Sequence, residues 1–205
     1  MTLCLIIGLT ACSGRSSEEA ADTDNGSEAS ETEQTDEAES NDISAGNTTL
    51  VVYFSATGNT KGVAEKIASI TGADIYEIKA AEEYTDEDLD WNDSDSRTTH
   101  EQNDPSVRPE IGSDPVSLDG YTTIYIGYPI WWGEEPRIMD TFVESYDFTG
   151  KKLTAICTSG GSDIGTSADY LQKLTKGKAE WKAGKLFSPQ AKDEDIKSWF
   201  NGLGL

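Results

Sequence analysis

The stretch LVVYFSATGNTKGVAEKIASI, residues 50–70, decides the fold of this chain. Its first five residues form a continuous apolar run rich in β-branched and aromatic side chains, which is typical of a strand covered on both faces of a parallel sheet. A short polar loop follows, and after it Val63, Ile67 and Ile70 recur at the spacing of one face of a helix. A buried strand that leads through a tight loop into a helix predicts an α/β domain.

The same alternation of strand and helix repeats down the rest of the chain. Further strands are expected at residues 75–78, 122–127, 153–157 and 181–187. Further helices are expected at about 136–145 and 193–203, with one more that carries Ala168, Leu171 and Leu174. Strands that alternate with helices imply a parallel sheet with helices on both faces, in which ligands bind at the carboxyl ends of the strands.

Length and composition exclude several classes of protein. With 205 residues, the chain accommodates one ordinary domain with residues to spare. Its 38 acidic side chains against 16 basic ones give a formal net charge of -22, which argues against a nucleic-acid binder because Lys and Arg supply the affinity for phosphate backbones. Three cysteines and one histidine are too few for a disulfide scaffold, a thiolate cluster or a histidine-based metal site, so no metal is expected.

The acidity is concentrated in two segments. Residues 13–48 carry eleven acidic side chains and one arginine, and residues 82–119 carry thirteen acidic side chains and two arginines. What remains, 49–81 together with 120–205, has fourteen acidic and thirteen basic side chains. The part of the chain that is expected to fold is therefore close to neutral and can build an ordinary hydrophobic core.

The N-terminus has the pattern of an export signal. Residues 3–11 form an apolar run that is shorter than the roughly 20 residues of a membrane-spanning helix and has the length of the apolar region of a secretory signal. The run ends in LTACS, residues 9–13, which resembles the lipobox of bacterial lipoproteins. That resemblance implies a signal peptide at residues 1–11 and a lipid-modified Cys12 as the mature N-terminus.

Residues 12–48 are expected to be a disordered tether. Small and polar residues dominate the segment and Ile43 is its only large apolar side chain, so it cannot bury enough surface to offset its chain entropy. As a flexible coil it would reach roughly 30 to 36 Å on average. Two or more acyl chains on Cys12 would make the anchoring stable. The protein is therefore expected to be extracytoplasmic and held on the bacterial cell membrane as a lipoprotein.

The segment 79–119, the acidic excursion, interrupts the alternation of strand and helix. One short helix is expected in it, where residues 85–88 precede Leu89 and Trp91 in the manner of a capping box. The rest of the segment is polar and loop-like. A long connection of this kind is either a surface elaboration or a lid, and surface elaboration is favoured.

The loop SATGNT at residues 55–60 joins the first strand to its helix. Unsatisfied backbone N–H groups at a helix N-terminus, together with the positive end of the helix dipole, bind phosphate without a lysine. Gly58 allows a tight turn, and side-chain donors come from Ser55, Thr57, Asn59 and Thr60. On its own, this pattern is as consistent with an ordinary helix cap as with a phosphate site. The chain has no GxxxxGK[ST] motif and no GxGxxG motif after a strand, which excludes those two nucleotide-binding signatures.

Two more loops at the carboxyl ends of expected strands have unusual compositions. GYPIWWGEEP, residues 127–136, contains adjacent tryptophans, and neighbouring side chains cannot both point into a core. At least one of Trp131 and Trp132 is therefore expected to face a cleft, where stacking on a flat aromatic ligand would explain the choice of tryptophan. TSGGSDIG, residues 158–165, offers close backbone approach and many hydrogen-bond donors.

Other titratable side chains have simpler interpretations. His100 lies in the polar excursion and is expected to be solvated. Cys157 ends an apolar strand and is expected to be a small buried hydrophobe. Glu134 and Glu135 follow the tryptophan pair and could act as acid or base, but on an exposed loop they are expected to be charge that faces a partner.

With these three loops in the same order, residues 49–203 resemble the flavodoxin family, and more closely a bacterial flavodoxin-like subgroup with GYPIWWG and TSGGS loops. The resemblance implies a three-layer, doubly wound α/β domain over residues 49–205, with five parallel strands in the order 2-1-3-4-5 and one non-covalent FMN. It also implies a phosphate loop and two loops that contact the flavin ring. The residues that match these loops are Ser55, Thr57, Gly58, Asn59 and Thr60; Pro129, Ile130, Trp131, Trp132 and Gly133; and Thr158, Ser159, Gly160 and Gly161.

Three functions are compatible with this resemblance. The favoured one is a membrane-tethered FMN electron carrier, expected to be a monomer, that passes electrons between redox partner proteins while the flavin supplies the redox chemistry. The second is an enzyme of the same fold that reduces a small quinone with NAD(P)H, although no nicotinamide site is recognisable. The third is a flavin-free interaction domain, which the intact phosphate loop and the paired tryptophans disfavour. No catalytic residue is assigned.

Overall fold

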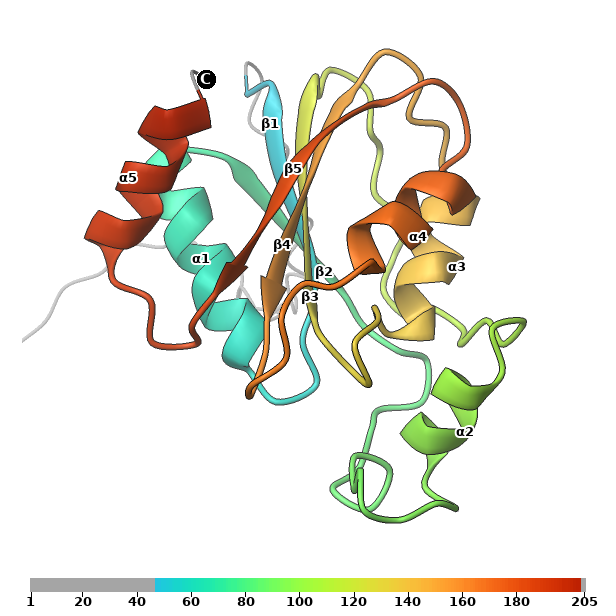
Figure 1. Cartoon of the computed structure of the whole chain (residues 1–205). Coiled ribbons are helices and arrows are strands. Elements are labelled where there is room, and N and C mark those ends of the chain that lie inside the picture. The colour runs from blue at the N-terminus through green and yellow to red at the C-terminus, as the bar shows by residue number, and fades with distance from the viewer. Residues whose placement is uncertain (1–46, 204–205) are drawn as a thin grey trace, which may run out of the picture. The chain divides into compact units, whose positions relative to one another are not determined.

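A computed structural model describes residues 47–203, which form one five-stranded parallel sheet with helices on both faces (Figure 1). The strands are β1 (Thr49–Phe54), β2 (Asp74–Ile78), β3 (Thr123–Pro129), β4 (Lys152–Thr158) and β5 (Glu180–Phe187). The helices are α1 (Asn59–Thr71), α2 (Arg97–Asn103), α3 (Arg137–Ser145), α4 (Ser167–Leu174) and α5 (Asp193–Leu203). The predicted signal peptide, Cys12 and the predicted tether as far as residue 46 lie outside the described residues.

The strand order is β2-β1-β3-β4-β5, and every neighbouring pair is parallel. This order confirms the predicted doubly wound, flavodoxin-like sheet. β3 runs two residues further than expected, because Tyr128 and Pro129 pair with Cys157 and Thr158 of β4. The carbonyl of Thr48, at the end of the predicted tether, already accepts hydrogen bonds from the chain that enters β3.

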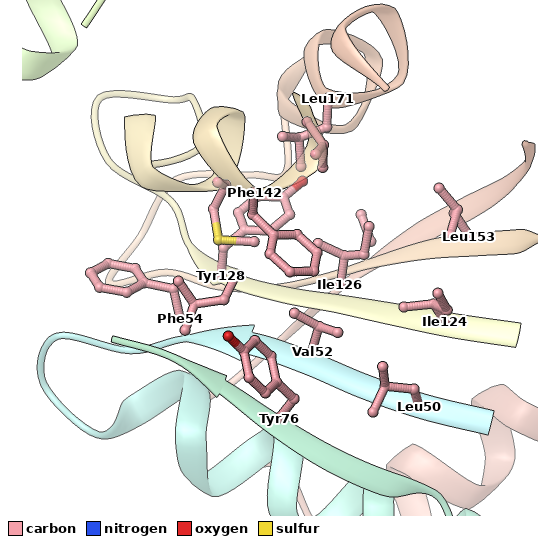
Figure 2. Packing of buried hydrophobic residues seen from close by; sticks show 14 of the residues in the cluster. Leu50, Val52, Phe54, Tyr76, Ile124, Ile126, Tyr128, Phe142, Leu153 and Leu171 are labelled. Carbon is pink, nitrogen blue, oxygen red and sulfur yellow. The ribbon is translucent and has the colours of Figure 1, made fainter. Parts of the chain in front are cut away.

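Alternate side chains of β1 enter two different cores, which explains why its sequence is apolar throughout. Val52 packs in a cluster with Phe142 of α3 and Leu171 of α4 (Figure 2). Its neighbour Val51 belongs to a second cluster, on the other face of the sheet, which includes Ile67 of α1 and side chains of α5. Within residues 47–203, no helix has the length and apolar character needed to cross a membrane.

The prediction of a helix that begins at residues 85–88 is wrong. These residues do exchange the paired hydrogen bonds of a capping box. Asp90 then accepts a hydrogen bond of 2.9 Å from the backbone N–H of Asn92, and this local bond diverts the chain into a turn. The helix of the acidic excursion is α2 instead, and the side chain of its N-cap residue Ser96 accepts from the backbone N–H of Thr99.

The two ends of the acidic excursion close on each other at its base. Ala80 and Ile111 form an antiparallel bridge. The backbone N–H of Gly112 donates to the carbonyl of Lys79 at 2.8 Å. A Cβ on Gly112 would lie 2.7 Å from Cα of Ala81, inside the van der Waals distance. The absence of a side chain at Gly112 therefore lets the two ends approach.

Gly112→Ala is expected to destabilise the protein by roughly 1 to 3 kcal/mol, because the added methyl group has to push two backbone segments apart. Gly202→Ala is the matched control, since its Cβ would meet nothing within 4 Å and alanine is favoured over glycine in a helix. Urea unfolding followed by circular dichroism measures both free energies of unfolding. Equal stability of the two variants would contradict the close approach at Gly112.

Candidate functional site

The loops that follow β1, β3 and β4 enclose a cavity of about 590 Å³ at the carboxyl edge of the sheet. The predicted site residues that line it are Thr57, Ile130, Trp131, Trp132, Ser159, Gly160 and Gly161. The other predicted residues lie in the same loops or at the ends of the adjoining elements without lining the cavity, and these are Ser55, Gly58, Asn59, Thr60, Pro129, Gly133 and Thr158. Lining residues outside the predicted set are Ser162 and, from the acidic excursion, Leu89, Trp91 and Thr98.

The N-terminus of α1 lacks a side-chain cap. Its N-cap residue is Gly58, with a φ of 82°, so the backbone N–H groups of the first turn are not capped by a side chain. The hydroxyl oxygen of Ser55 is buried and has no hydrogen-bond partner among the described residues. Thr57 is exposed, and its Oγ1 accepts a hydrogen bond of 3.1 Å from the side-chain amide of Asn59. These available donors favour an anion site at this loop over an ordinary helix cap.

A buried hydrogen bond connects the first loop to the third. The hydroxyl groups of Thr60 and Thr158 are 2.8 Å apart, and both residues are buried. Gly127 of β3 permits this close packing, because a Cβ there would lie 3.0 Å from Cβ of Tyr53 and 3.5 Å from Cγ2 of Thr60. The hydroxyl groups of these two predicted cofactor residues are therefore bonded to each other, and they fix the relative position of the two loops.

A tight turn after β3 presents the two tryptophans differently. The backbones of Trp131 and Glu134 exchange two hydrogen bonds of 2.9 Å, and the residues between them have positive φ, 49° for Trp132 and 84° for Gly133. Two successive positive φ angles are characteristic of a type I′ turn, and such a φ is strained for tryptophan. The ring of Trp131 packs 5.7 Å from that of Phe54, whereas Trp132 is 48% exposed. Both side chains line the cavity, in agreement with the expectation that at least one faces a cleft.

Ser159 organises the third loop. Its Oγ accepts hydrogen bonds from the backbone N–H groups of Gly161, at 3.0 Å, and Ser162, at 2.7 Å. These bonds hold the loop in a tight local turn. A Cβ on Gly160 or Gly161 would meet nothing within 4 Å. The backbone of this loop is therefore open to approach by a ligand.

Helix α2 fastens the acidic excursion to the tryptophan turn. Nε2 of Gln102 donates to the carbonyl oxygens of Trp131, at 3.0 Å, and Glu135, at 3.2 Å. In return, the guanidinium of Arg137 donates to the carbonyl oxygens of Glu101 and Gln102 at the end of α2. The excursion is therefore part of the site, which corrects its interpretation as a surface elaboration. No local pattern around Gln102 or Arg137 signals this contact, because each residue has its partners in another segment.

The expectation that Glu134 and Glu135 are exposed, partner-facing charge is wrong for Glu135, whereas Glu134 is partly exposed. Glu135 is fully buried, and Glu134 pairs with the guanidinium of Arg137 at 2.6 Å. The physical reason is that Arg137 is itself buried and requires carboxylates nearby. Its guanidinium lies 3.9 Å from Glu135 and 3.7 Å from Asp140, and Arg108 also lies 3.7 Å from Asp140. The two glutamates therefore belong to a partly buried polar cluster around Arg137, beside the tryptophan turn.

Burial raises the pKa of Glu135 to about 8, and the neighbouring Asp140 carboxylate adds to the shift. Neither carboxyl oxygen of Glu135 has a hydrogen-bond partner among the described residues. Burial also raises the pKa of Asp140, but Arg108 and Arg137 oppose that effect. The two arginines therefore favour the charged form of Asp140, whereas burial favours the protonated form of Glu135.

His100 is exposed and Cys157 is fully buried, as expected. Burial raises the pKa of the Cys157 thiol to about 12, so this residue presents no reactive thiolate at neutral pH. In the described part of the chain, no group of three His, Cys, Asp or Glu side chains is arranged to hold a metal ion.

The sheet and the cavity define a doubly wound α/β protein with its ligand site at the carboxyl edge of a 2-1-3-4-5 sheet. The chain belongs to the flavodoxin family, because the family model described as Flavodoxin matches residues 48–203. No curated protein matches the chain.

Solved structures of similar proteins share this fold. The chain is 42% identical to a protein from Bacteroides eggerthii that is provisionally described as a flavoprotein, with a TM-score of 0.72 over 77% of this chain and 98% of that chain. A protein from Bacteroides uniformis with the same description is 44% identical, with a TM-score of 0.72 over 76% of this chain and 99% of that chain. A flavoprotein from Lactobacillus acidophilus, solved in complex with FMN, is 23% identical, with a TM-score of 0.58 over 75% and 99% of the two chains.

The free energy of unfolding is expected to fall as the pH rises from about 5 to 8. Glu135 keeps its proton in the folded protein up to about pH 8, whereas the unfolded chain releases it near the ordinary value of 4.5. This one group contributes a slope that approaches about 1.4 kcal/mol per pH unit. Glu135→Gln should make the free energy of unfolding depend less on pH. Glu134 is the partly exposed neighbour of Glu135, and Glu134→Gln should leave the pH dependence unchanged. Urea unfolding at a series of pH values measures both, and equal slopes for the wild type and Glu135→Gln would contradict a buried proton.

Proposed function

We propose that this protein binds FMN non-covalently and passes electrons between partner proteins. One observation carries the proposal: the loop with the unpartnered hydroxyl of Ser55 and the uncapped N-terminus of α1 reaches, through Thr57, a cavity that is also lined by Trp131 and Trp132. The uncapped helix N-terminus and the free hydroxyl suit a phosphate, and the two tryptophans suit a flat aromatic ring. FMN carries both groups. Membership of the flavodoxin family supports the same cofactor, and the Lactobacillus acidophilus protein of the same fold binds FMN.

The residues present fit this cofactor. The phosphate would accept hydrogen bonds from the first backbone N–H groups of α1 and from the hydroxyl groups of Ser55 and Thr57. The ring would contact Trp131 and Trp132, and its polar edge would face the open backbone at residues 159–161. When bound, FMN supplies the redox chemistry, while the protein supplies binding, orientation and electrostatics.

The lining of the cavity favours an electron carrier over a substrate-reducing enzyme. Its lining residues are threonine, leucine, tryptophan, isoleucine, serine and glycine, none of which is ionisable. A reductase that uses NAD(P)H has to bind a second phosphorylated nucleotide, for which Arg or Lys is the usual partner. Among the described residues, neither side chain lines this cavity. Reduction of a small quinone by NAD(P)H is therefore the alternative that the experiment below has to exclude.

We also propose that a lipid on Cys12 anchors the protein on the outer face of the bacterial membrane, with the acidic residues that follow as a spacer. The LTACS motif at residues 9–13 supports this placement, which would keep the domain near membrane-bound redox partners. Cell fractionation tests it directly. Cys12→Ser should move the protein from the membrane fraction to the soluble fraction, and unchanged fractionation would refute the anchor.

Ser55→Ala and Thr57→Ala are each expected to weaken FMN binding by roughly 1 to 3 kcal/mol, the value of one hydrogen bond to a charged group. Riboflavin binding should change much less, because riboflavin lacks the phosphate. Ser162→Ala is the control, since this hydroxyl lines the cavity from the third loop and should affect both ligands alike. Fluorescence titration with each ligand measures the dissociation constants. Equal losses for FMN and riboflavin in Ser55→Ala would place the phosphate elsewhere.

The full chain loaded with FMN distinguishes a carrier from a reductase. In a potentiometric titration, a carrier should be reduced in two separate one-electron steps, and stopped-flow mixing with NADH or NADPH should reduce it only slowly. Rapid reduction by either nucleotide would assign the protein to the reductase class. A single two-electron step would overturn the carrier mechanism, and failure to take up FMN would overturn the flavoprotein proposal itself.

A further inference from the structure

Two of the four large hydrophobic side chains that are exposed among the described residues line the same cavity. They are Trp91 of the acidic excursion, which is 73% exposed, and Trp132 of the turn after β3. The other two, Ile75 and Tyr170, do not line it. Exposed indole rings from two distant segments that meet at one cavity indicate a ligand with an extended apolar face.

We propose that Trp91 is a further aromatic contact for the flavin ring, beside Trp131 and Trp132, and that the acidic excursion forms one wall of the cofactor site. This inference rests on the proposed function, because it assigns a residue to the same FMN site. Leu89 and Thr98 of the same segment also line the cavity, so three residues of the acidic excursion contribute to this wall. Figure 1 shows the green segment around α2 at the end of the sheet toward which the strand arrows point.

The turn that carries Trp91 is attached to α2 on both sides. The hydroxyl of Thr98 donates to the carbonyl of Asp88 at 2.6 Å, and the hydroxyl of Thr99 donates to the carbonyl of Asp93 at 2.9 Å. Both threonines are buried, so water competes little for these bonds. The indole of Trp91 is therefore exposed on a turn whose two ends are fixed.

Helix α2 is held in turn by a network around Glu101, a buried carboxylate. Its Oε1 lies 2.7 Å from Nε of Arg97, and its Oε2 accepts a hydrogen bond of 2.8 Å from the hydroxyl of Tyr84. The guanidinium of Arg97 lies 4.0 Å from the centre of the Tyr84 ring. That ring packs edge-on against Trp131, with 5.5 Å between the ring centres. Continuous contacts therefore connect the turn of Trp91 to the tryptophan turn.

These contacts describe a preorganised wall and not a mobile lid. Segments that open easily have few buried contacts and exposed hydrogen bonds. In the acidic excursion, the bonds that position Trp91 involve buried threonines, and the base is closed by backbone hydrogen bonds next to Gly112. An aromatic side chain that is already in place loses little conformational freedom when it stacks on a ring. Trp91 should therefore contribute to the affinity for the flavin ring, and this contribution should not depend on the phosphate.

The test is a titration of full-length protein, freed of flavin, with FMN and with riboflavin, followed by flavin fluorescence. Trp91→Ala is expected to raise both dissociation constants by about three- to tenfold, the effect of one lost aromatic contact. Trp91→Phe keeps a ring at the position and should restore most of the affinity. Bound flavin should also be brighter in Trp91→Ala, because a stacked indole quenches its emission. Tyr170→Ala is the matched control, since this aromatic side chain is exposed on α4 away from the cavity lining.

The outcomes separate this inference from the proposed function. If the wild type binds FMN and Trp91→Ala matches Tyr170→Ala, Trp91 does not contact the ring and the proposed function stands. A loss in Trp91→Ala that is confined to FMN would also overturn the inference, because it would place Trp91 at the phosphate. A wild type that binds neither ligand would overturn both. Circular dichroism checks that each variant is folded, as expected for changes at exposed side chains.

Discussion

The close parallel pairing of β1 with β3 is the constraint on which the candidate site depends. Tyr53 lies in register with Gly127, and the missing side chain of Gly127 leaves room for Tyr53 and for the start of α1. The hydroxyl of Thr60, in the first turn of α1, then reaches the hydroxyl of Thr158 at the end of β4. Three loops from distant parts of the chain therefore share one rigid frame, and their polar groups are placed before any ligand arrives.

Arg137 extends this frame to the acidic excursion. This residue lies at the start of α3, and its guanidinium donates hydrogen bonds to carbonyl oxygens at the end of α2. It also pairs with Glu134 of the tryptophan turn and lies near the buried carboxyl groups of Glu135 and Asp140. A buried guanidinium is tolerated only with such partners. Burial raises the pKa of Glu135 although this guanidinium opposes the shift, so the charge beside the tryptophan turn depends on pH. The excursion is thus joined to the site by polar contacts as well as by aromatic packing.

The sheet was predictable because its signals are local: continuous apolar runs such as β1 indicate buried strands. The three loops were singled out by their small or aromatic residues at the carboxyl ends of these strands, and their expected role in binding FMN came from the resemblance to the flavodoxin family. Three features were not predictable, because distant partners create them. The position of α2 depends on contacts among Arg97, Glu101 and Tyr84. Glu135 is buried by its neighbours although it lies in a charged run. Trp91 lines the cavity although it belongs to a polar segment. Local patterns show neither burial nor proximity of this kind.

On the proposed function, three loops and the acidic excursion form one FMN site at the carboxyl edge of the sheet. A crystal structure of the full-length protein grown with FMN is the most direct test. We expect the phosphate at the N-terminus of α1 beside Ser55 and the flavin ring in contact with both Trp132 and Trp91. A phosphate bound away from α1, or a ring bound outside the cavity that these tryptophans line, would contradict it.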